Sequence, residues 1–239
     1  MIFYTFFGVA VIVAVHLFGY RLLGYKGRSA RLLASLAGGT SVAYVFLQIL
    51  PKLAYSDLIL TQSEILSAAR WQHHAFLLAM VGMIGFLGID QMTKKLSLEG
   101  QPNSMINHFR IIVVVYFFYN FLVGYVLSFQ WGVGGGRSLF LYVLAMSFHF
   151  LFVGYMLGRH HSEHKVIQVR WYFAAALSLG WLASLVRELR PEFLASLLAL
   201  LAGAMIVITL KEELRDETLD EFFTFALGAF LYTILLMRI

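Results

Sequence analysis

The sequence contains no cysteine and is poor in charge. Only 13% of its 239 residues are charged, whereas soluble domains usually carry about 25%. Without thiols the chain can form no disulfide, thiolate metal site or iron–sulfur cluster. The low charge, together with 60% hydrophobic residues and a mean hydropathy of +0.79, predicts an integral membrane protein rather than a soluble enzyme.

The length leaves room for membrane spans and little else. A spanning helix needs about 20 apolar residues, so the chain can hold about eight spans and no sizeable extramembrane domain. We therefore predict an all-α polytopic membrane protein with a single transmembrane domain over residues 1–239. No G-x-S-x-G, H-E-x-x-H or P-loop motif occurs, so we do not expect an enzyme. The net charge of +5 is not gathered in a long basic run, which argues against a nucleic-acid partner and fits loops that face an anionic leaflet.

Eight apolar segments can be recognised, and the lysines and arginines between them predict an orientation. The expected spans are 2–23, 32–53, 73–93, 109–129, 138–158, 169–187, 192–211 and 219–238. Of the 18 Lys and Arg residues, twelve fall on one side, and the other side has Lys52, Arg70, Arg137, Arg187, Arg190 and Arg238. The positive-inside rule then predicts that both termini lie outside the cytoplasm. We expect the membrane to be the plasma (inner) membrane.

Small residues and an internal echo indicate how the spans are organised. Glycines in several spans predict close helix packing, namely Gly38, Gly39, Gly82, Gly85, Gly88, Gly154 and Gly158. Residues 119–127 and 149–157 share Val-Gly-Tyr and a leucine two places further on. Spans four and five would then be related elements flanked by three helices on each side. Transporters often contain such repeats, inverted repeats among them, with the site at the bilayer midplane.

Two polar residues fall at the middle of neighbouring spans. Asn120 lies near the centre of span four and His149 near the centre of span five, so both can face the bundle interior at one depth. Tyr116 shares a helix face with Asn120, and Gln48 is an uncharged polar residue of span two. These groups form either a small polar site or an interhelical hydrogen bond worth about 0.6–1.7 kcal/mol.

His16 and Asp90 form a second candidate pair. Both are predicted toward the cytoplasmic half of their spans, where they could carry a proton or hold two helices together. The alternative is that Asp90 lies at the interface and is solvated. Different depths for His16 and His149 argue against a haem held between them, so no haem is expected.

The loop after span five contains the densest group of metal-type ligands. His160, His161, Glu163 and His164 carry imidazole nitrogens and a carboxylate, which suit zinc, copper or nickel. Arg159 and Lys165 flank the group and disfavour a cation, so a solvated cytoplasmic loop is the alternative. The sequence therefore leaves open whether the protein binds a divalent metal or no cofactor.

Spans four and five resemble the ZIP (Zrt/Irt-like) metal transporters. That family carries His-Asn-x-x-Asp/Glu-Gly in its fourth helix, matched here by residues 119–124, and His-Asp/Glu/Asn-x-x-Glu/His-Gly in its fifth, matched by residues 149–154. Its second helix often has His-x-x-Pro near the outer end, where this chain has residues 48–51, beginning with Gln48. The resemblance implies eight spans in a 3+2+3 arrangement, outside termini, and a transport site that includes Tyr119.

The chain departs from the family at most ligand positions. Tyr119, Val123, Phe150 and Val153 replace family ligands, and the carboxylates that would neutralise a dication are missing. We therefore predict no tight two-metal zinc site in the spans.

Two functions remain from these observations. The first is a ZIP-like transporter of a metal ion or another small solute through a site between spans four and five. The second is a non-transporting ZIP-like membrane protein that acts as a regulator or subunit. The expected partners are the lipid bilayer and the small solute or metal ion, with homo-oligomerisation left open.

Overall fold

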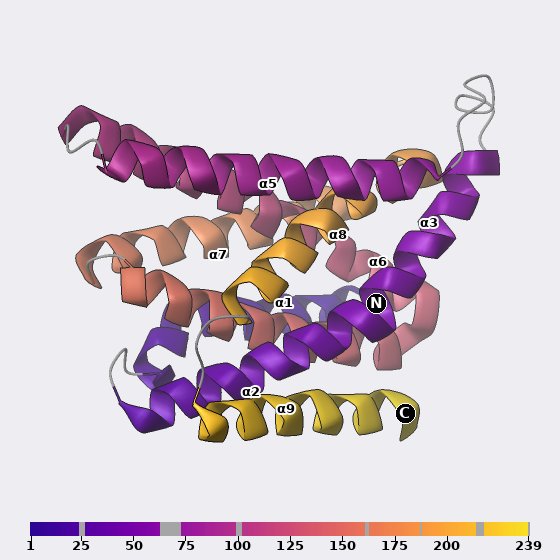
Figure 1. Cartoon of the computed structure of the whole chain (residues 1–239). Coiled ribbons are helices and arrows are strands. Elements are labelled where there is room, and N and C mark those ends of the chain that lie inside the picture. The colour runs from indigo at the N-terminus through magenta and orange to yellow at the C-terminus, as the bar shows by residue number, and fades with distance from the viewer. Residues whose placement is uncertain are drawn as a thin grey trace. The chain divides into compact units, whose positions relative to one another are not determined.

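The computed structural model is all-α over the residues it describes, as the sequence predicts. These residues are 1–23, 27–62, 73–98, 102–160, 163–186, 188–213 and 218–238. The elements in chain order (Figure 1) are α1 (Ile2–Leu23), α2 (Arg28–Tyr44), the π-helical turn η1 (Val45–Ile49), α3 (Leu50–Gln62), α5 (His74–Leu98), α6 (Pro102–His160), α7 (Glu163–Val186), α8 (Pro191–Glu213) and α9 (Leu219–Arg238).

These elements divide into two compact units, each described here by itself. Unit 1 comprises Met1–Tyr44, Asn120–Arg187 and Thr209–Ile239, and unit 2 comprises Val45–Tyr119 and Glu188–Ile208. The prediction of a single transmembrane domain stays a prediction.

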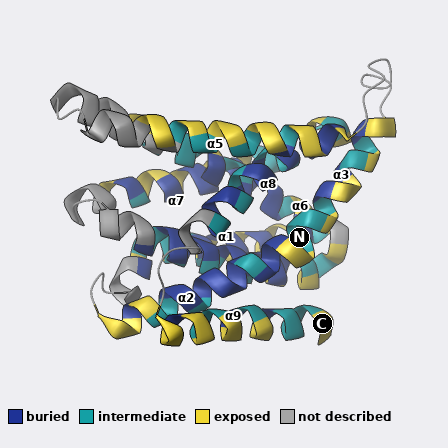
Figure 2. Ribbon diagram, in the orientation of Figure 1, coloured by how far each residue is buried: buried dark blue, intermediate teal, exposed yellow. Residues whose placement is uncertain are grey.

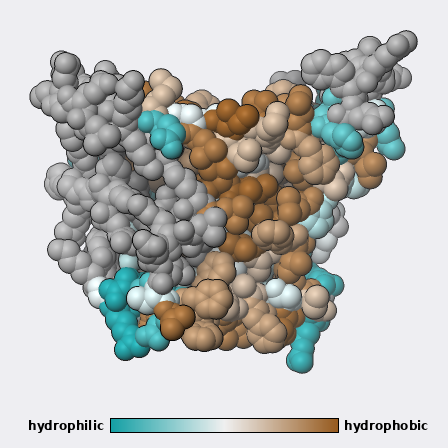
Figure 3. All heavy atoms as spheres, in the orientation of Figure 1, coloured by the Kyte–Doolittle hydropathy of each residue, from teal (hydrophilic) through white to brown (hydrophobic). Residues whose placement is uncertain are grey.

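The helices match the expected spans closely. Among the described residues, seven helical stretches are long and apolar enough to cross a membrane, and the remaining expected span corresponds to the shorter apolar helix His74–Ile89 within α5. Such helices are compatible with an integral membrane protein. Figure 3 shows the apolar surface of α9, with hydrophilic residues at its two ends. The exposed apolar side chains of α9 include Phe222, Phe223, Leu227, Phe230 and Leu231.

The second helical stretch is longer than the 32–53 predicted, because Pro51 does not end it. α2, η1 and α3 follow one another without a break. Proline inside a helix lacks an N–H group, and its ring clashes with the carbonyl four residues earlier, here that of Leu47. Leu47 lies within η1, where the π turn widens the helix. The wider turn accommodates the proline, so the stretch continues to Gln62.

A glycine kink splits α6 into the two spans expected at 109–129 and 138–158. Gly134 (φ −144°, ψ 20°) and Gly135 (φ 59°, ψ −148°) have non-helical backbone angles. The positive φ of Gly135, combined with that ψ, is essentially restricted to glycine. The chain therefore turns sharply here.

In unit 1, α2 lies along α9 for its whole length (Figure 1), and Figure 2 shows α2 as the more buried of the two. The helices approach closely because each presents a glycine to the other. A Cβ added at Gly39 would collide with the backbone of Phe225, and one at Gly228 would collide with the backbone of Leu36. Such glycine contacts let helix backbones pack tightly in a bilayer.

Unit 2 has the same close packing of glycine against a neighbouring backbone, between α5 and α8. A Cβ at Gly82 would collide with the backbone of Leu200, and one at Gly203 with the backbone of Ala79. Around this crossing lies a core of small and branched apolar residues, which comprises Leu53, Leu60, Ala75, Ala79, Ala195, Ala199 and Ala202.

Other predicted glycine contacts are absent. A Cβ at Gly85, Gly88 or Gly154 would meet no atom within 4 Å. The predicted close packing at these three positions was wrong, because each faces away from the neighbouring helices. Of the two glycines in the repeated Val-Gly-Tyr sequence, Gly124 is the one that packs against a backbone, that of Leu177 in α7.

Candidate functional site

Three polar side chains meet inside unit 1. His16 comes from α1, Asn120 from the first half of α6 and His149 from the second half. The side chains of His16 and Asn120 are hydrogen-bonded, and His149 lies within electrostatic range of His16. Asn120 and His149 are fully buried, in agreement with the prediction that both face the bundle interior.

Aromatic rings enclose the imidazoles. The ring centroid of Phe150 lies 4.3 Å from that of His16 and 5.5 Å from that of His149, and Phe173 lies 6.0 Å from His16. The Nε2 atom of His16 is buried and makes no hydrogen bond within the described part of the chain. An unsatisfied buried polar atom costs about 1–3 kcal/mol, which a bound ligand or water would recover. The cluster therefore has an open position at this atom.

The two halves of α6 are held in register next to the cluster. The hydroxyl of Tyr142 donates a 2.9 Å hydrogen bond to the carbonyl oxygen of Val123. Val123 follows Asn120 by three residues, and Tyr142 precedes His149 by seven, which is about two helical turns on the same face. This bond thus helps to fix the relative heights of the helix segments that carry Asn120 and His149.

α7 holds α1 in place at two levels. The indole Nε1 of Trp181 donates to Oγ1 of Thr5 over 3.1 Å, and Nη1 of Arg170 donates to the carbonyl of Leu17 over 3.1 Å. The second bond lies directly beside His16 in the sequence. α7 therefore sets both the rotation and the height of the His16 side chain.

The remaining polar candidates of the spans belong to unit 2. Gln48 is half-buried within η1, and Tyr119 is buried. The ring of Tyr116 contacts those of Tyr119 and Phe86, with centroid separations of 6.3 and 5.9 Å. Their assignment to the transport site stays a prediction.

The loop candidates lie outside the described residues. They comprise His161 and the side chains of His160, Glu163 and His164. The side chain of Asp90 is likewise outside the described residues, so the His16–Asp90 pair stays a prediction.

The structure corrects the predicted position of His16. The sequence argument placed His16 and His149 at different depths, whereas the structure brings them together around Asn120. The error came from counting depth along straight helices with uncertain ends. One signal could have found the arrangement: an ionisable residue inside a span needs a polar partner, and Asn120 and His149 are the polar residues expected at mid-depth.

Metal-type ligands are sparse in the spans. Within the described ranges, no three or more His, Cys, Asp or Glu side chains gather as metal ligands would. No model of a known protein family matches the chain, and no curated protein sequence matches it.

Proposed function

We propose that this chain is an integral membrane transporter of a small solute or metal ion, with its translocation site at His16, Asn120 and His149. One observation carries the proposal. Polar side chains from α1 and from both halves of α6 meet in unit 1, where Asn120 and His149 are fully buried and His16 is half-buried. Such groups are costly at membrane depth and often mark substrate pathways. A ZIP-like arrangement is part of the proposal, supported by the agreement between the predicted spans and the helices.

The chemistry of the cluster restricts the cargo. Two imidazoles and one amide offer nitrogen and oxygen ligands but no negative charge. A dication in this apolar setting would keep its charge uncompensated, at a cost of several kcal/mol. A monovalent cation leaves only one charge uncompensated, and imidazole nitrogens are suitable ligands for copper. The cargo is therefore a monovalent ion such as copper(I) rather than zinc.

The test is uptake into proteoliposomes that contain the purified full-length chain. Silver(I), zinc(II) and potassium are offered separately, and the trapped metal is measured by mass spectrometry. Silver uptake should exceed zinc uptake. His16→Phe and Asn120→Leu should each lower silver uptake by about tenfold or more, which corresponds to about 1.4 kcal/mol.

Ser184→Ala is the matched control. The hydroxyl of Ser184 donates to Oγ of Ser128 over 2.7 Å, so this variant also removes a polar contact between α6 and α7 but leaves the cluster intact. Uptake should persist in it. Equal silver uptake by the wild type and both cluster variants would contradict the proposed site.

The second candidate function is a non-transporting membrane protein in which the cluster only joins helices. The His16–Asn120 hydrogen bond favours it, since such bonds contribute about 0.6–1.7 kcal/mol to helix association. This candidate predicts that the cluster variants lower the unfolding temperature while the wild type moves none of the offered ions.

A further inference from the structure

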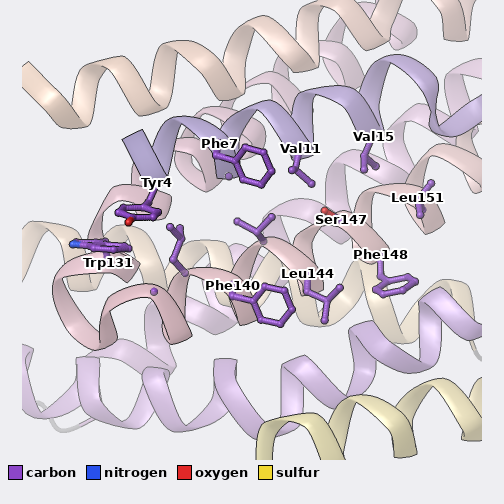
Figure 4. Close-up of a pocket in the computed structure, with 14 residues that line it drawn as sticks. Tyr4, Phe7, Val11, Val15, Trp131, Phe140, Leu144, Ser147, Phe148 and Leu151 are labelled. Carbon is purple, nitrogen blue, oxygen red and sulfur yellow. The ribbon is translucent and has the colours of Figure 1, made fainter. Parts of the chain in front are cut away.

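A second feature of unit 1 does not involve the polar cluster. A groove of about 420 Å³ runs between α1 and the second half of α6. Its walls are almost entirely apolar, with Val11 and Val15 on one side and Phe140, Leu144 and Phe148 on the other (Figure 4). The volume is in the range of pockets that bind small molecules. None of the three cluster residues lines it.

The groove has one aromatic end. Tyr4 and Trp131 stack there with ring centroids 4.7 Å apart and an interplanar angle of 9° (Figure 4). Tyr4 lies in the first turn of α1, and Trp131 lies just before the kink at Gly134 and Gly135. Both positions are therefore at helix ends, where tyrosine and tryptophan typically mark the boundary between lipid tails and headgroups. This end of the groove is its headgroup end.

The length of the groove matches one leaflet. Tyr4 and Val15 are eleven residues apart in α1, which corresponds to about 16 Å along a helix. Half of the hydrocarbon core of a bilayer is about 15 Å thick. An acyl chain that starts at the Tyr4–Trp131 pair would therefore follow the groove to its inner end near Leu151.

A positive charge lies next to the headgroup end. Arg137 directly follows the groove residue Gly136 and is exposed. Residues 1–23 and 102–160, which include both walls, contain no Asp or Glu. Among the described side chains, no carboxylate forms an ion pair with Arg137. An anionic headgroup would supply the counter-charge that the protein does not.

From the apolar walls, the aromatic end, the length and the charge, we propose that this groove holds one acyl chain of an anionic phospholipid, with the phosphate beside Arg137. The occupant is a lipid of the surrounding bilayer. The site goes beyond the proposed transport and does not depend on it.

The experiment is native mass spectrometry of the full-length protein, delipidated in detergent and titrated with phosphatidylglycerol or phosphatidylcholine. The wild type should bind one phosphatidylglycerol in preference to phosphatidylcholine. Arg137→Gln should weaken phosphatidylglycerol binding by about fivefold and leave phosphatidylcholine binding unchanged, since a surface arginine contributes about 1 kcal/mol toward an anionic lipid. Val11→Phe, which fills the groove, should weaken the binding of both lipids.

Two matched controls lie on α9. Arg238→Gln removes an exposed arginine at another helix end, and Leu231→Phe adds an equal ring to an exposed apolar position outside the groove. Neither should change lipid binding. Equal binding of both lipids by the wild type, or an effect of Arg137→Gln no larger than that of Arg238→Gln, would overturn the proposal. A lipid-free dimer that dissociates in Val11→Phe would also overturn it, because the occupant would then be a second copy of the chain.

A second measurement determines the direction in which the acyl chain of the lipid lies in the groove. Phosphatidylglycerol brominated near its headgroup should quench the tryptophan fluorescence of the wild type more than that of Trp131→Phe. Bromine at the tail end should remove this difference. The same difference for both bromine positions would contradict the predicted direction of the acyl chain.

Discussion

The α5–α8 crossing of unit 2 packs around alanine, leucine and glycine, whereas the helices of unit 1 combine glycine contacts with hydrogen bonds from buried side chains. In unit 2 the core between α5 and α8 consists of methyl groups and glycine contacts. In unit 1 the phenols of Tyr142 and Tyr232 donate to the carbonyls of Val123 and Leu141, and the indole of Trp181 donates to Thr5. Apolar contacts depend on shape alone, but hydrogen bonds also fix rotation and height.

The difference bears on function. A site that distinguishes solutes must hold its groups in one geometry, and directional bonds do this better than methyl contacts. In unit 1 two such bonds lie within two helical turns of the cluster, one at Val123 and one at Leu17. The candidate site therefore lies in the unit whose helices are positioned by polar contacts. Substitutions at Gly203, at the polar cluster and at the ends of α2 and α9 test this contrast.

The largest effect is expected where backbones touch in unit 2. In Gly203→Ala the added methyl group would collide with the carbonyl of Ala79, a backbone atom that cannot rotate away. We expect α5 and α8 to separate, with a loss of about 3 kcal/mol or more in unfolding free energy. Thermal unfolding of the purified protein in detergent measures this loss.

Gly85→Ala is the control for helix propensity. Gly85 lies in α5 near the same crossing but has open space around its Cα. Alanine there should be neutral or should stabilise by up to about 1 kcal/mol. Similar unfolding temperatures for the two variants would mean that this crossing does not hold unit 2 together.

An intermediate effect is expected from the polar cluster. In a double-mutant cycle, His16→Phe and Asn120→Leu are measured singly and together. Each single variant leaves one buried polar group without its partner and should cost about 1–3 kcal/mol. The coupling energy should be about 0.6–1.7 kcal/mol, the range found for interhelical hydrogen bonds in membranes. Strictly additive losses would show that the two side chains do not interact.

How far the sequence predicts this molecule depends on the kind of feature. The spans follow from hydrophobic length, and in the part of the chain that the structure describes, seven of the eight have helices long and apolar enough to cross a membrane. The burial of Asn120 and His149 follows from the cost of a polar group in lipid. Both predictions rest on local composition, which a single sequence contains.

Other features depend on contacts between distant segments. The sequence could not show that Gly82 packs and Gly85 does not, because that depends on which face of α5 meets α8. The second span was predicted to end at residue 53, whereas the helix continues through Pro51 to Gln62, because a π turn cannot be recognised from residue types alone. His16 was placed away from His149 because the depth of a residue is not fixed until its helix is packed.

The smallest effects concern the ends of α2 and α9, where polar contacts lie outside the apolar interior. Arg31 Nε donates to Glu221 over 2.7 Å, and Arg28 pairs with Asp220 over 2.5 Å. The side chain of Glu221 is 11% exposed, whereas that of Asp220 is 59% exposed. Glu221 also forms a reciprocal capping box with Thr218, in which each side chain accepts from the other residue's backbone N–H. Arg31→Gln should therefore cost about 1–2 kcal/mol, because it leaves a nearly buried carboxylate with fewer donors.

Arg28→Gln should lower the unfolding free energy least, by at most about 0.5 kcal/mol, because both charges of the Arg28–Asp220 pair are in contact with solvent. The ionic strength distinguishes the effects of Arg28→Gln and Arg31→Gln. Raising the ionic strength to about 1 M shortens the screening length to about 3 Å, which should abolish the Arg28 effect. The Arg31 effect should largely persist, since its bond to Glu221 is short and the carboxylate is shielded from solvent. Thermal unfolding of both variants at low and high salt measures this, and equal salt sensitivity would imply that Glu221 is as solvated as Asp220.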